Sequence, residues 1–320
     1  MDKLGFRVLR LWTLGICLLE TLAMQAQQPV IQSSDFFVET TDNVSIHVHR
    51  KVRAASNKVP VLLIHGTWCD GRIWDFPGRS VMDYLAVRGY DVYALDLRGM
   101  GSSDHPPNYF TIDIVSRVQD AVAVADYIVA NTGRAPVVMG WSQGGVVTGL
   151  LAASAPQLVA GLGFFSVPAD GFFVPPQIAP VLQNVIASGV DRFVPTSDLI
   201  YALAFAIDPT TGKPTISTDA FNTFLSLTAV DSVAAILEEV SPDFFNATLV
   251  PAWPAMNVPA LVVDGTLDPT VGQDRAQALF NALGSTNKQL TIFPRNSHTW
   301  FLEDDYNASV RVFDQFLSQF

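Results

Sequence analysis

The sequence is poor in charged residues and contains no basic run. Charged side chains make up 15% of its 320 residues, whereas soluble domains average about 25%. The charges that are present are mainly acidic, and the formal net charge is −11. A nucleic-acid partner requires clustered lysines and arginines to neutralise phosphates, so we expect no nucleic-acid partner.

Long apolar runs are also missing, and the apolar stretch near the start is short. Basic residues at positions 3, 7 and 10 precede nine largely apolar residues at 11–19, which Glu20 ends. A membrane span needs about 20 apolar residues, so this pattern indicates a secretory signal and no stable membrane span. We predict a signal peptide at 1–26 and a secreted protein, with an uncleaved anchor or a misassigned start as alternatives.

The secretory interpretation bears on cysteine, charge and glycosylation. Cys17 lies in the signal, so Cys69 alone would remain and no internal disulfide could form. Cleavage would remove three basic and two acidic residues and leave a net charge of −12. Three N-x-S/T sequons, at Asn43, Asn246 and Asn307, fit glycosylation along a eukaryotic secretory route.

Short apolar runs that end in glycine or turn residues alternate with longer helical patterns. The runs predict strands within 44–48, 59–66, 90–95, 135–138, 158–167, 258–265 and 289–293. The helical patterns predict helices at 81–87, 112–130, from 144 onward, 273–283 and 306–320. Strands that alternate with helices indicate an α/β fold with a parallel sheet covered on both faces.

The alternation stops near residue 168 and resumes at 258. We therefore predict a core in two parts, 27–167 and 258–320, with a lid at 168–257 inserted between them. The lid region is helical in pattern and rich in aromatic residues, and positions 169–250 hold nine acidic residues but only two basic ones, Arg192 and Lys213. This composition predicts an apolar pocket that offers little to an anionic ligand.

A serine stands between two glycines in GWSQG at 140–144, after a predicted strand and before a helical pattern. A strand that becomes a helix within two residues makes a tight bend, and Gly140 and Gly144 remove the Cβ atoms that would clash there. The bend lifts the hydroxyl of Ser142 clear of the backbone, as a nucleophile requires. The alternative is a small residue at a crowded turn.

A serine nucleophile needs a base, and five histidines are candidates. His47 and His49 share one face of an early strand and have the spacing of two metal ligands. No third ligand is evident, so we predict no metal site. His65 ends a buried strand and suits a turn, and His105 lies in a proline-flanked loop. His298 follows the last predicted strand, at the edge where active sites of parallel sheets gather. We predict His298 as the base; a helix-capping role is the alternative.

The acid that orients the base should come from a loop at the same edge of the sheet. The segment LVVDGTLDPTVG offers Asp264, which ends a strand, and Asp268, in the turn that follows. A turn residue can reach across to His298, whereas backbone amides at the strand end would occupy Asp264. We therefore favour Asp268 over Asp264.

Three further segments fit this arrangement: HGTW at 65–68, DLRGMGSSD at 96–104 and GTLD at 265–268. With the order serine, aspartate, histidine, the chain resembles the α/β-hydrolase fold family over nearly all of residues 35–320, in particular its serine-nucleophile branch of esterases and lipases. The resemblance implies a mostly parallel central sheet with helices on both faces, a helical lid after the sixth strand, and no cofactor. In DLRGMGSSD we expect a structural role, with Arg98 paired to a carboxylate.

The resemblance also implies an oxyanion hole, formed by the backbone N–H groups of Thr67 and Gln143. The amide of Gln143 lies at a helix N-terminus, where the dipole favours the negative charge of a tetrahedral intermediate. The side chains expected to bind the substrate are aromatic and come from the loop after the third strand, the residue before the nucleophile and the lid. They are Trp68, Trp141, Phe172, Phe173, Tyr201 and Phe205.

We predict a secreted serine hydrolase that cleaves a small, hydrophobic, uncharged ester, lactone or thioester through an acyl-enzyme on Ser142. The serine excludes the aspartate-based epoxide hydrolases and haloalkane dehalogenases of this family. An acyltransferase or cyclase of secondary metabolism, a C–C hydrolase or a perhydrolase would use the same three residues. A ligand-binding receptor with slow turnover is the alternative from another class, and the sequence leaves the oligomeric state open.

Overall fold

The computed structural model describes residues 30–54, 56–170, 184–185, 187–240 and 251–320. Three sequence predictions lie outside the described residues: the signal peptide at 1–26, the sequon at Asn246, and the pair Phe172 and Phe173.

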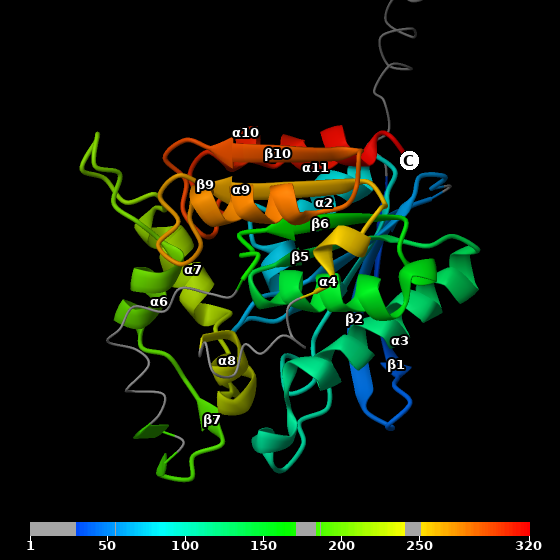
Figure 1. The fold of residues 1–320 in the computed structure, drawn as a ribbon, viewed down its shortest axis with the longest axis horizontal. Helices are drawn as coiled ribbons and strands as arrows, with labels where there is room; N and C mark the ends of the chain where they lie inside the picture. The colour runs from blue at the N-terminus through cyan, green and yellow to red at the C-terminus, as the bar shows by residue number, and fades with distance from the viewer. Residues whose placement is uncertain (1–29, 55, 171–183, 186, 241–250) are drawn as a thin grey trace, which may run out of the picture. The chain divides into compact units, whose positions relative to one another are not determined.

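The buried apolar runs form an eight-stranded sheet with the spatial order β1-β2-β4-β3-β5-β6-β9-β10 (Figure 1). The strands are β1 (Ile31–Glu39), β2 (Ser45–Arg53), β3 (Pro60–Ile64), β4 (Asp91–Leu95), β5 (Val137–Trp141), β6 (Gly161–Phe165), β9 (Ala260–Gly265) and β10 (Lys288–Phe293). From β4 to β10 every neighbouring pair is parallel, and only β1 and β2 run antiparallel to their neighbours. The predicted α/β fold with a mostly parallel sheet is confirmed.

Helices cover both faces of this sheet. The described helices of the core are η1 (Gly71–Asp75), α2 (Val81–Val87), η2 (Tyr109–Thr111), α3 (Ile114–Thr132), α4 (Gln143–Ser154), η3 (Pro156–Leu158), α9 (Gln273–Ala282), α10 (Tyr306–Ser309) and α11 (Arg311–Leu317). Local signals set their ends, as in α3, where Asp113 forms a capping box and Gly133, at φ +69°, ends the helix.

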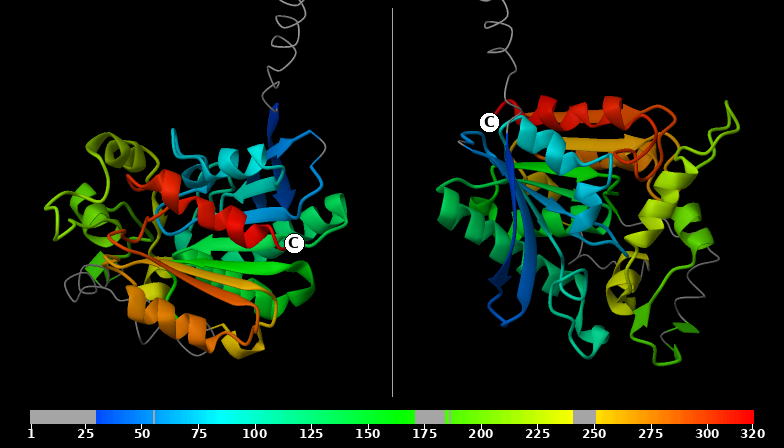
Figure 2. Two further views of the ribbon diagram at one scale, coloured as in Figure 1. Left: turned by 90° about the horizontal axis from the view of Figure 1, so that it is seen from above. Right: turned by 180° about the vertical axis from the view of Figure 1, so that it is seen from behind.

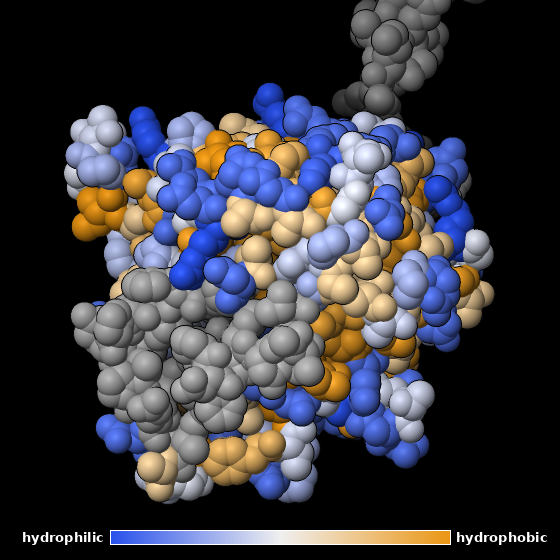
Figure 3. Space-filling view, viewed as in Figure 1, coloured by the Kyte–Doolittle hydropathy of each residue, from blue (hydrophilic) through white to orange (hydrophobic). Residues whose placement is uncertain are grey.

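Side chains of the central strands alternate between two apolar cores. Val61 and Leu63 of β3 pack in the core beneath α2 and α11, whereas Leu62 and Ile64 pack in the core beneath α3, α4 and α9. The two views of Figure 2 show these helix layers on opposite sides of the sheet. The outer surface over α9 is largely hydrophilic (Figure 3), as expected for a helix that buries only one face.

Several predicted elements match closely, and two do not. The predicted helix at 81–87 has the bounds of α2, and the predicted strands all fall on observed ones. The single closing helix predicted at 306–320 is wrong: Phe313 N–H donates to Val310 O, three residues back, and the chain divides into α10 and α11 there. The strand β1 was not predicted, because most of its residues are exposed and show no alternation.

Residues 166–259, which join β6 to β9, are called the β6–β9 segment here. Its described elements are β7 (Arg192–Phe193), α6 (Ser197–Ala204), α7 (Thr218–Ser226), β8 (Asp231–Ser232), α8 (Val233–Val240) and η4 (Trp253–Ala255). Figures 1 and 2 show α6, α7 and α8 beyond the ends to which the arrows of β9 and β10 point. The segment therefore lies at the carboxyl edge of the sheet, where Ser142 and His298 also lie.

Candidate active site

Ser142 occupies a strained turn between β5 and α4. Its φ is +55°, a left-handed value that a residue with a side chain rarely adopts. The bend depends on its glycines, because a Cβ on Gly144 would lie 2.4 Å from Ile64 O, and one on Gly140 would lie 2.1 Å from Gly144 O. Strain held in this way by close backbone packing is common at functional residues.

The loop after β3 passes directly against Ser142. A Cβ built on Gly66 would lie 3.0 Å from Ser142 Cβ, so Gly66 is needed for this approach. Thr67 follows Gly66 directly, and Gln143 follows Ser142, so each residue expected to form the oxyanion hole is next in sequence to a residue of this close approach.

His298 and Asp268 are in direct contact. His298 Nδ1 lies 2.8 Å from Asp268 Oδ2, and their side chains are 6% and 0% exposed. Asp268 also accepts backbone hydrogen bonds from Thr270 (2.7 Å) and Val271 (2.9 Å) through Oδ1. Burial alone would raise the pKa of Asp268, but the charge and hydrogen bond of His298 outweigh burial and hold that pKa below its ordinary value.

Asp264, the other candidate acid, is occupied elsewhere. Its Oδ1 accepts a hydrogen bond from the backbone N–H of Gly265 at 2.8 Å and one from Ser166 Oγ at 3.1 Å. Burial and the negative charge of Asp268 raise the pKa of Asp264 well above its ordinary value. Asp264 is therefore bonded at the strand end, and Asp268 in the turn is the carboxylate that contacts His298.

The loop that carries His298 is bonded to the core and, through Ser166 and Ala204, to the β6–β9 segment. The carbonyl oxygen of His298 accepts hydrogen bonds from Trp141 Nε1 (2.9 Å) and Ser166 Oγ (3.0 Å). The N–H of Ser297 donates to both carboxylate oxygens of Glu303, at 3.0 and 3.1 Å, and Ser297 Oγ donates to Glu303 Oε1. Burial raises the pKa of Glu303 to about 8. Trp141, the residue before the serine, is thus bonded directly to the backbone of the histidine.

Two buried charged residues near Ser142 were missed by the sequence analysis. Arg117 of α3 and Asp231 of β8 form an ion pair with both side chains 0% exposed. Arg117 also donates to Gln143 Oε1, and Asp231 accepts from Trp68 N–H at 3.1 Å. One signal was present: Arg117 lies between Ile114 and Val118 on the apolar stripe of a predicted helix, where a charge needs a buried partner.

Four of the aromatic residues predicted to bind the substrate, those on described positions, belong to one apolar cluster. Trp141 is buried, and its ring lies edge-on to Phe224 of α7 at a centroid distance of 6.5 Å. Phe224 packs on Phe205, which contacts Tyr201 at 6.0 Å. Trp68 is buried, with Phe193 at 6.2 Å. Tyr201 is half-buried, whereas Trp141, Phe205 and Phe224 are buried, so Tyr201 has side-chain surface that a ligand could contact.

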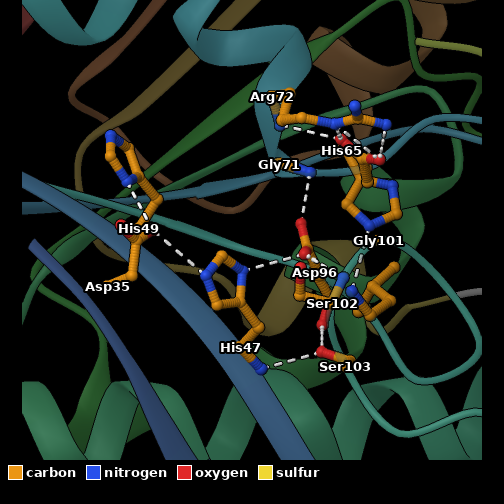
Figure 4. Close-up of polar contacts among 12 residues, drawn as sticks. Asp35, His47, His49, His65, Gly71, Arg72, Asp96, Gly101, Ser102 and Ser103 are labelled. Carbon is orange, nitrogen blue, oxygen red and sulfur yellow. Dashed lines mark hydrogen bonds and ion pairs between the residues drawn. The ribbon is translucent and has the colours of Figure 1, made fainter.

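His47 and His49 lie in a polar cluster with Asp35 and Asp96 (Figure 4). His47 contacts Asp96 through Nδ1 at 2.9 Å and Asp35 through Nε2 at 3.1 Å, and His49 contacts Asp35 at 2.8 Å. An imidazole that bonds carboxylates through both nitrogens is the protonated form. The hydrogen bond to Asp96 accordingly raises the pKa of His47.

These two histidines line a cavity of ≈ 480 Å³ together with Asp35, Asp75 and Asp96, and their side chains are 15% and 21% exposed. Among the residues that the structure describes, no group of three or more His, Cys, Asp or Glu side chains is arranged to hold a metal ion.

The segment at 96–104 has the structural role expected of it. Arg98 pairs with Asp120 at 2.7 Å and with Asp42 at 2.7 Å, which confirms the predicted carboxylate partner. His65 donates through Nδ1 to Gly66 O and accepts at Nε2 from Leu97 N–H, and burial lowers its pKa. A neutral histidine therefore joins the loop after β3 to the loop after β4.

Two of the three sequons fall on described residues, and both are exposed. Asn43 lies in the turn between β1 and β2, and Asn307 lies in α10. In the described part of the chain, no helix is long and apolar enough to cross a membrane.

Comparison with known proteins agrees with this geometry. The chain is 24% identical over 250 residues to pimeloyl-[acyl-carrier protein] methyl ester esterase of Vibrio campbellii, covering 76% of this chain and 89% of that one. It is 30% identical to triacylglycerol lipase of Pseudarthrobacter phenanthrenivorans over 140 residues, 41% of this chain and 39% of the lipase. The solved enol-lactonase of Burkholderia xenovorans superposes with a TM-score of 0.68 at 17% identity, over 88% of this chain and all of that one.

A family model described as "Alpha/beta hydrolase family" matches residues 61–311. This range is most of the chain, and it contains the strained serine turn, the Asp268–His298 pair and the parallel part of the sheet. The protein therefore belongs to the alpha/beta hydrolase family, and it is a hydrolase of the esterase type.

Proposed function

We propose that the protein is a serine hydrolase that cleaves a small, hydrophobic, uncharged ester, lactone or thioester, with Ser142, His298 and Asp268 as its catalytic triad. The observation that carries the proposal is the contact of His298 Nδ1 with Asp268 Oδ2 at 2.8 Å, in a loop bonded to Trp141, the residue before Ser142. Because Nδ1 is occupied by Asp268, Nε2 is the nitrogen left to take a proton from Ser142.

In this mechanism His298 Nε2 accepts the Ser142 proton while Oγ forms a bond to the acyl carbon. The backbone N–H groups of Thr67 and Gln143 stabilise the oxyanion, and the helix N-terminus at Gln143 favours the same charge. The bond to the leaving alcohol, enol or thiol then breaks, and His298 returns the proton to the leaving atom. Water, deprotonated by His298, releases the acid from the acyl-enzyme.

The uncharged character of the substrate follows from the β6–β9 segment, which we propose is a lid at 168–257. Residues 169–250 carry nine acidic and two basic residues. Both bases are exposed, and Arg192 is paired with Asp191. An anionic acyl group would find no buried cation in the described part of this segment to replace its hydration.

A panel of p-nitrophenyl esters tests the proposal. Acetate, butyrate and decanoate should be hydrolysed, and the hemisuccinate, which adds a negative charge to a short acyl chain, should be the poorest substrate. Ser154→Ala, at the far end of α4, is the matched control for Ser142→Ala and should keep the wild-type rates. Faster turnover of the hemisuccinate than of butyrate would contradict the assigned substrate class.

We further propose secretion, cleavage of residues 1–26 and glycosylation at exposed sequons. Basic residues ahead of a short apolar run support the signal, and the exposure of Asn43 and Asn307 supports modification. Expression in a eukaryotic secretory host should give protein in the medium whose mass falls on treatment with an N-glycosidase. Full-length, unmodified protein retained in the cells would contradict this part of the proposal.

A further inference from the structure

The buried ion pair between Asp231 and Arg117 reaches both loops of the proposed oxyanion hole. We propose that Asp231 is a positioning residue, through which the β6–β9 segment fixes the backbone that stabilises the oxyanion. The inference rests on the proposed function and adds to it a residue with no place in the triad. The β6–β9 segment, which the sequence shows only as an insertion, would then affect the rate of catalysis.

Asp231 holds the loop after β3 at the residue that follows Thr67. Its Oδ2 accepts the Trp68 N–H at 3.1 Å, and the nearby Ala229 N–H donates to Trp68 O at 2.7 Å. Both peptide groups of Trp68 are thus bonded to one short stretch of the β6–β9 segment. The Trp68 N–H belongs to the peptide group that joins it to Thr67, so this contact fixes the position of Thr67 as well.

The backbone of Trp68 has a conformation that needs these two hydrogen bonds to hold it. Its φ is +59°, in the left-handed region that a residue with a side chain avoids. Such a conformation persists only where the surrounding contacts impose it. The described contacts of Trp68 backbone atoms with Asp231 and Ala229 come from a segment more than 150 residues away in the sequence. Loss of these bonds should let the loop relax and move the Thr67 amide.

Arg117 connects Asp231 to the other half of the proposed oxyanion hole. Its Nη2 donates to Asp231 Oδ1, and its Nη1 donates to Gln143 Oε1. Arg117 and Asp231 are each 0% exposed, so each charge depends on the other for compensation. One ion pair therefore joins the backbone at Trp68 to the side chain of Gln143. The backbone N–H of Gln143 is the second proposed oxyanion donor.

The stretch around Asp231 is anchored well enough to act as a fixed support. Ser232 Oγ lies 2.8 Å from the carbonyl oxygens of Tyr109 and Ile112, and Ser232 N–H donates to Asp231 Oδ1 at 2.7 Å. Glu238 accepts the Ile114 N–H at 2.7 Å, at the start of α3. These contacts tie β8 and α8 to the helix that also carries Arg117.

A second buried ion pair provides a control. Asp120, also of α3 and 0% exposed, accepts the backbone N–H of Arg98 at 2.9 Å and pairs with its guanidinium. Asp231 and Asp120 therefore each bind one backbone N–H and one arginine in the interior. They differ in location, because the hydrogen bonds given for Arg98 and Asp120 within the described residues join them to each other and to Asp42, and not to Trp68 or Gln143. A purely structural role would make the two aspartates equivalent.

The test compares Asp231→Ala and Asp120→Ala in the full chain with p-nitrophenyl acetate, after titration of active sites with a fluorophosphonate. Both variants should lower Tm, because Asp231→Ala removes the carboxylate paired with the buried Arg117, and Asp120→Ala leaves the buried Arg98 with Asp42 alone. Only Asp231→Ala should lower kcat per titrated site, by about 10- to 100-fold with KM little changed, since loss of a whole oxyanion donor costs about 10²- to 10³-fold. Equal kcat per site in the two variants would overturn the inference.

The double variant Arg117→Met/Asp231→Leu keeps the inference testable if Asp231→Ala does not fold. Replacing both charges with apolar side chains removes the unpaired charge and should restore Tm. The Trp68 N–H would still lack its acceptor, so kcat per site should stay low. Wild-type kcat in the folded double variant would overturn the inference, whereas a wild-type protein that the fluorophosphonate does not titrate would overturn the proposed function instead.

Discussion

The two sides of the site differ in their support. The loop of His298 is bonded to Trp141 and Glu303 of the core and also to the β6–β9 segment, where Ser166 Oγ lies 3.0 Å from His298 O and Ala204 O accepts from Ser297 Oγ at 2.8 Å. The loop after β3 is held on its outer side by the β6–β9 segment, through Ala229 and Asp231. The loop of His298 therefore has supports in both the core and the insertion, whereas the described hydrogen bonds of the Trp68 backbone come from the insertion alone.

This difference separates two kinds of substitution. A change in the core loops should affect every substrate alike, because each substrate needs the same proton transfers. A change in the β6–β9 segment should act through substrate contact at Tyr201 or through the oxyanion loop at Trp68. The first would alter the ranking of substrates, and the second would lower kcat for all of them.

The largest effect should come from the base. His298→Gln removes the proton acceptor, and we expect kcat to fall by about 10⁴-fold or more for acetyl and decanoyl esters alike. His105→Gln is the matched control, because His105 bonds Tyr109 and Gly101 and no residue of the proposed triad. A fall of similar size in the control, or a normal rate in His298→Gln, would remove the core side of the comparison.

The next effect distinguishes the two aspartates. Asp268→Asn should lower kcat by about 10⁴-fold, because the carboxylate sets the tautomer of His298 and stabilises its cation. Asp264→Asn should change kcat little, because Asp264 Oδ1 contacts Gly265 and Ser166, whereas Asp268 makes the contact with His298. Steady-state kinetics at neutral pH would decide, and the reverse pattern would assign the acid to Asp264.

A smaller effect should appear in the substrate-facing part of the β6–β9 segment. Tyr201→Ala removes apolar surface worth roughly 1–3 kcal/mol where a long acyl chain contacts it. We expect kcat/KM for decanoyl esters to fall about 10- to 100-fold, with acetyl esters little changed. Phe37→Ala, at an exposed aromatic of β1, is the control. Equal losses for both esters would place Tyr201 outside the pocket.

The smallest effect concerns stability at the β1–β2 hairpin. The hydrogen bond to Asp96 raises the pKa of His47 above 6.5, so its stabilising contribution is complete below pH 6.5 and is lost as pH rises through the folded-state pKa. Asp35 and Asp96 are the acids that face it, and His49 shares Asp35. The Tm difference between the wild type and His47→Gln should therefore shrink from about pH 6 to about pH 9. A difference that grows over this range would contradict the assignment, and Ser154→Ala should show no such trend.

Much of the fold could be predicted, because its signals are local. The buried run at 59–66 and the helical period at 81–87 depend on neighbouring residues alone, and both elements are present. The break at Val310 could not be predicted, because the apolar pattern of 306–320 continues through it. The strand β1 is recognisable only from its pairing with β2, since its own residues are mostly exposed.

The candidate site divides in the same way. Ser142, Asp268 and His298 were found because each stands in a short pattern at a strand end. Asp231 stands in no pattern, and its partner Arg117 is 114 residues away, so the pair becomes visible only when the chain is folded. Arg117 on an apolar stripe could have indicated that an acid was needed, but nothing in the sequence says which of the nine acids of 169–250 supplies it.

Covalent labelling of the nucleophile tests the central claim most directly. The wild type, Ser142→Ala and Ser154→Ala would be incubated with a fluorophosphonate and examined by intact-mass spectrometry and peptide mapping. The account predicts a single adduct on Ser142 in the wild type and in Ser154→Ala, and none in Ser142→Ala. An unlabelled wild type, or an adduct that persists in Ser142→Ala, would contradict it.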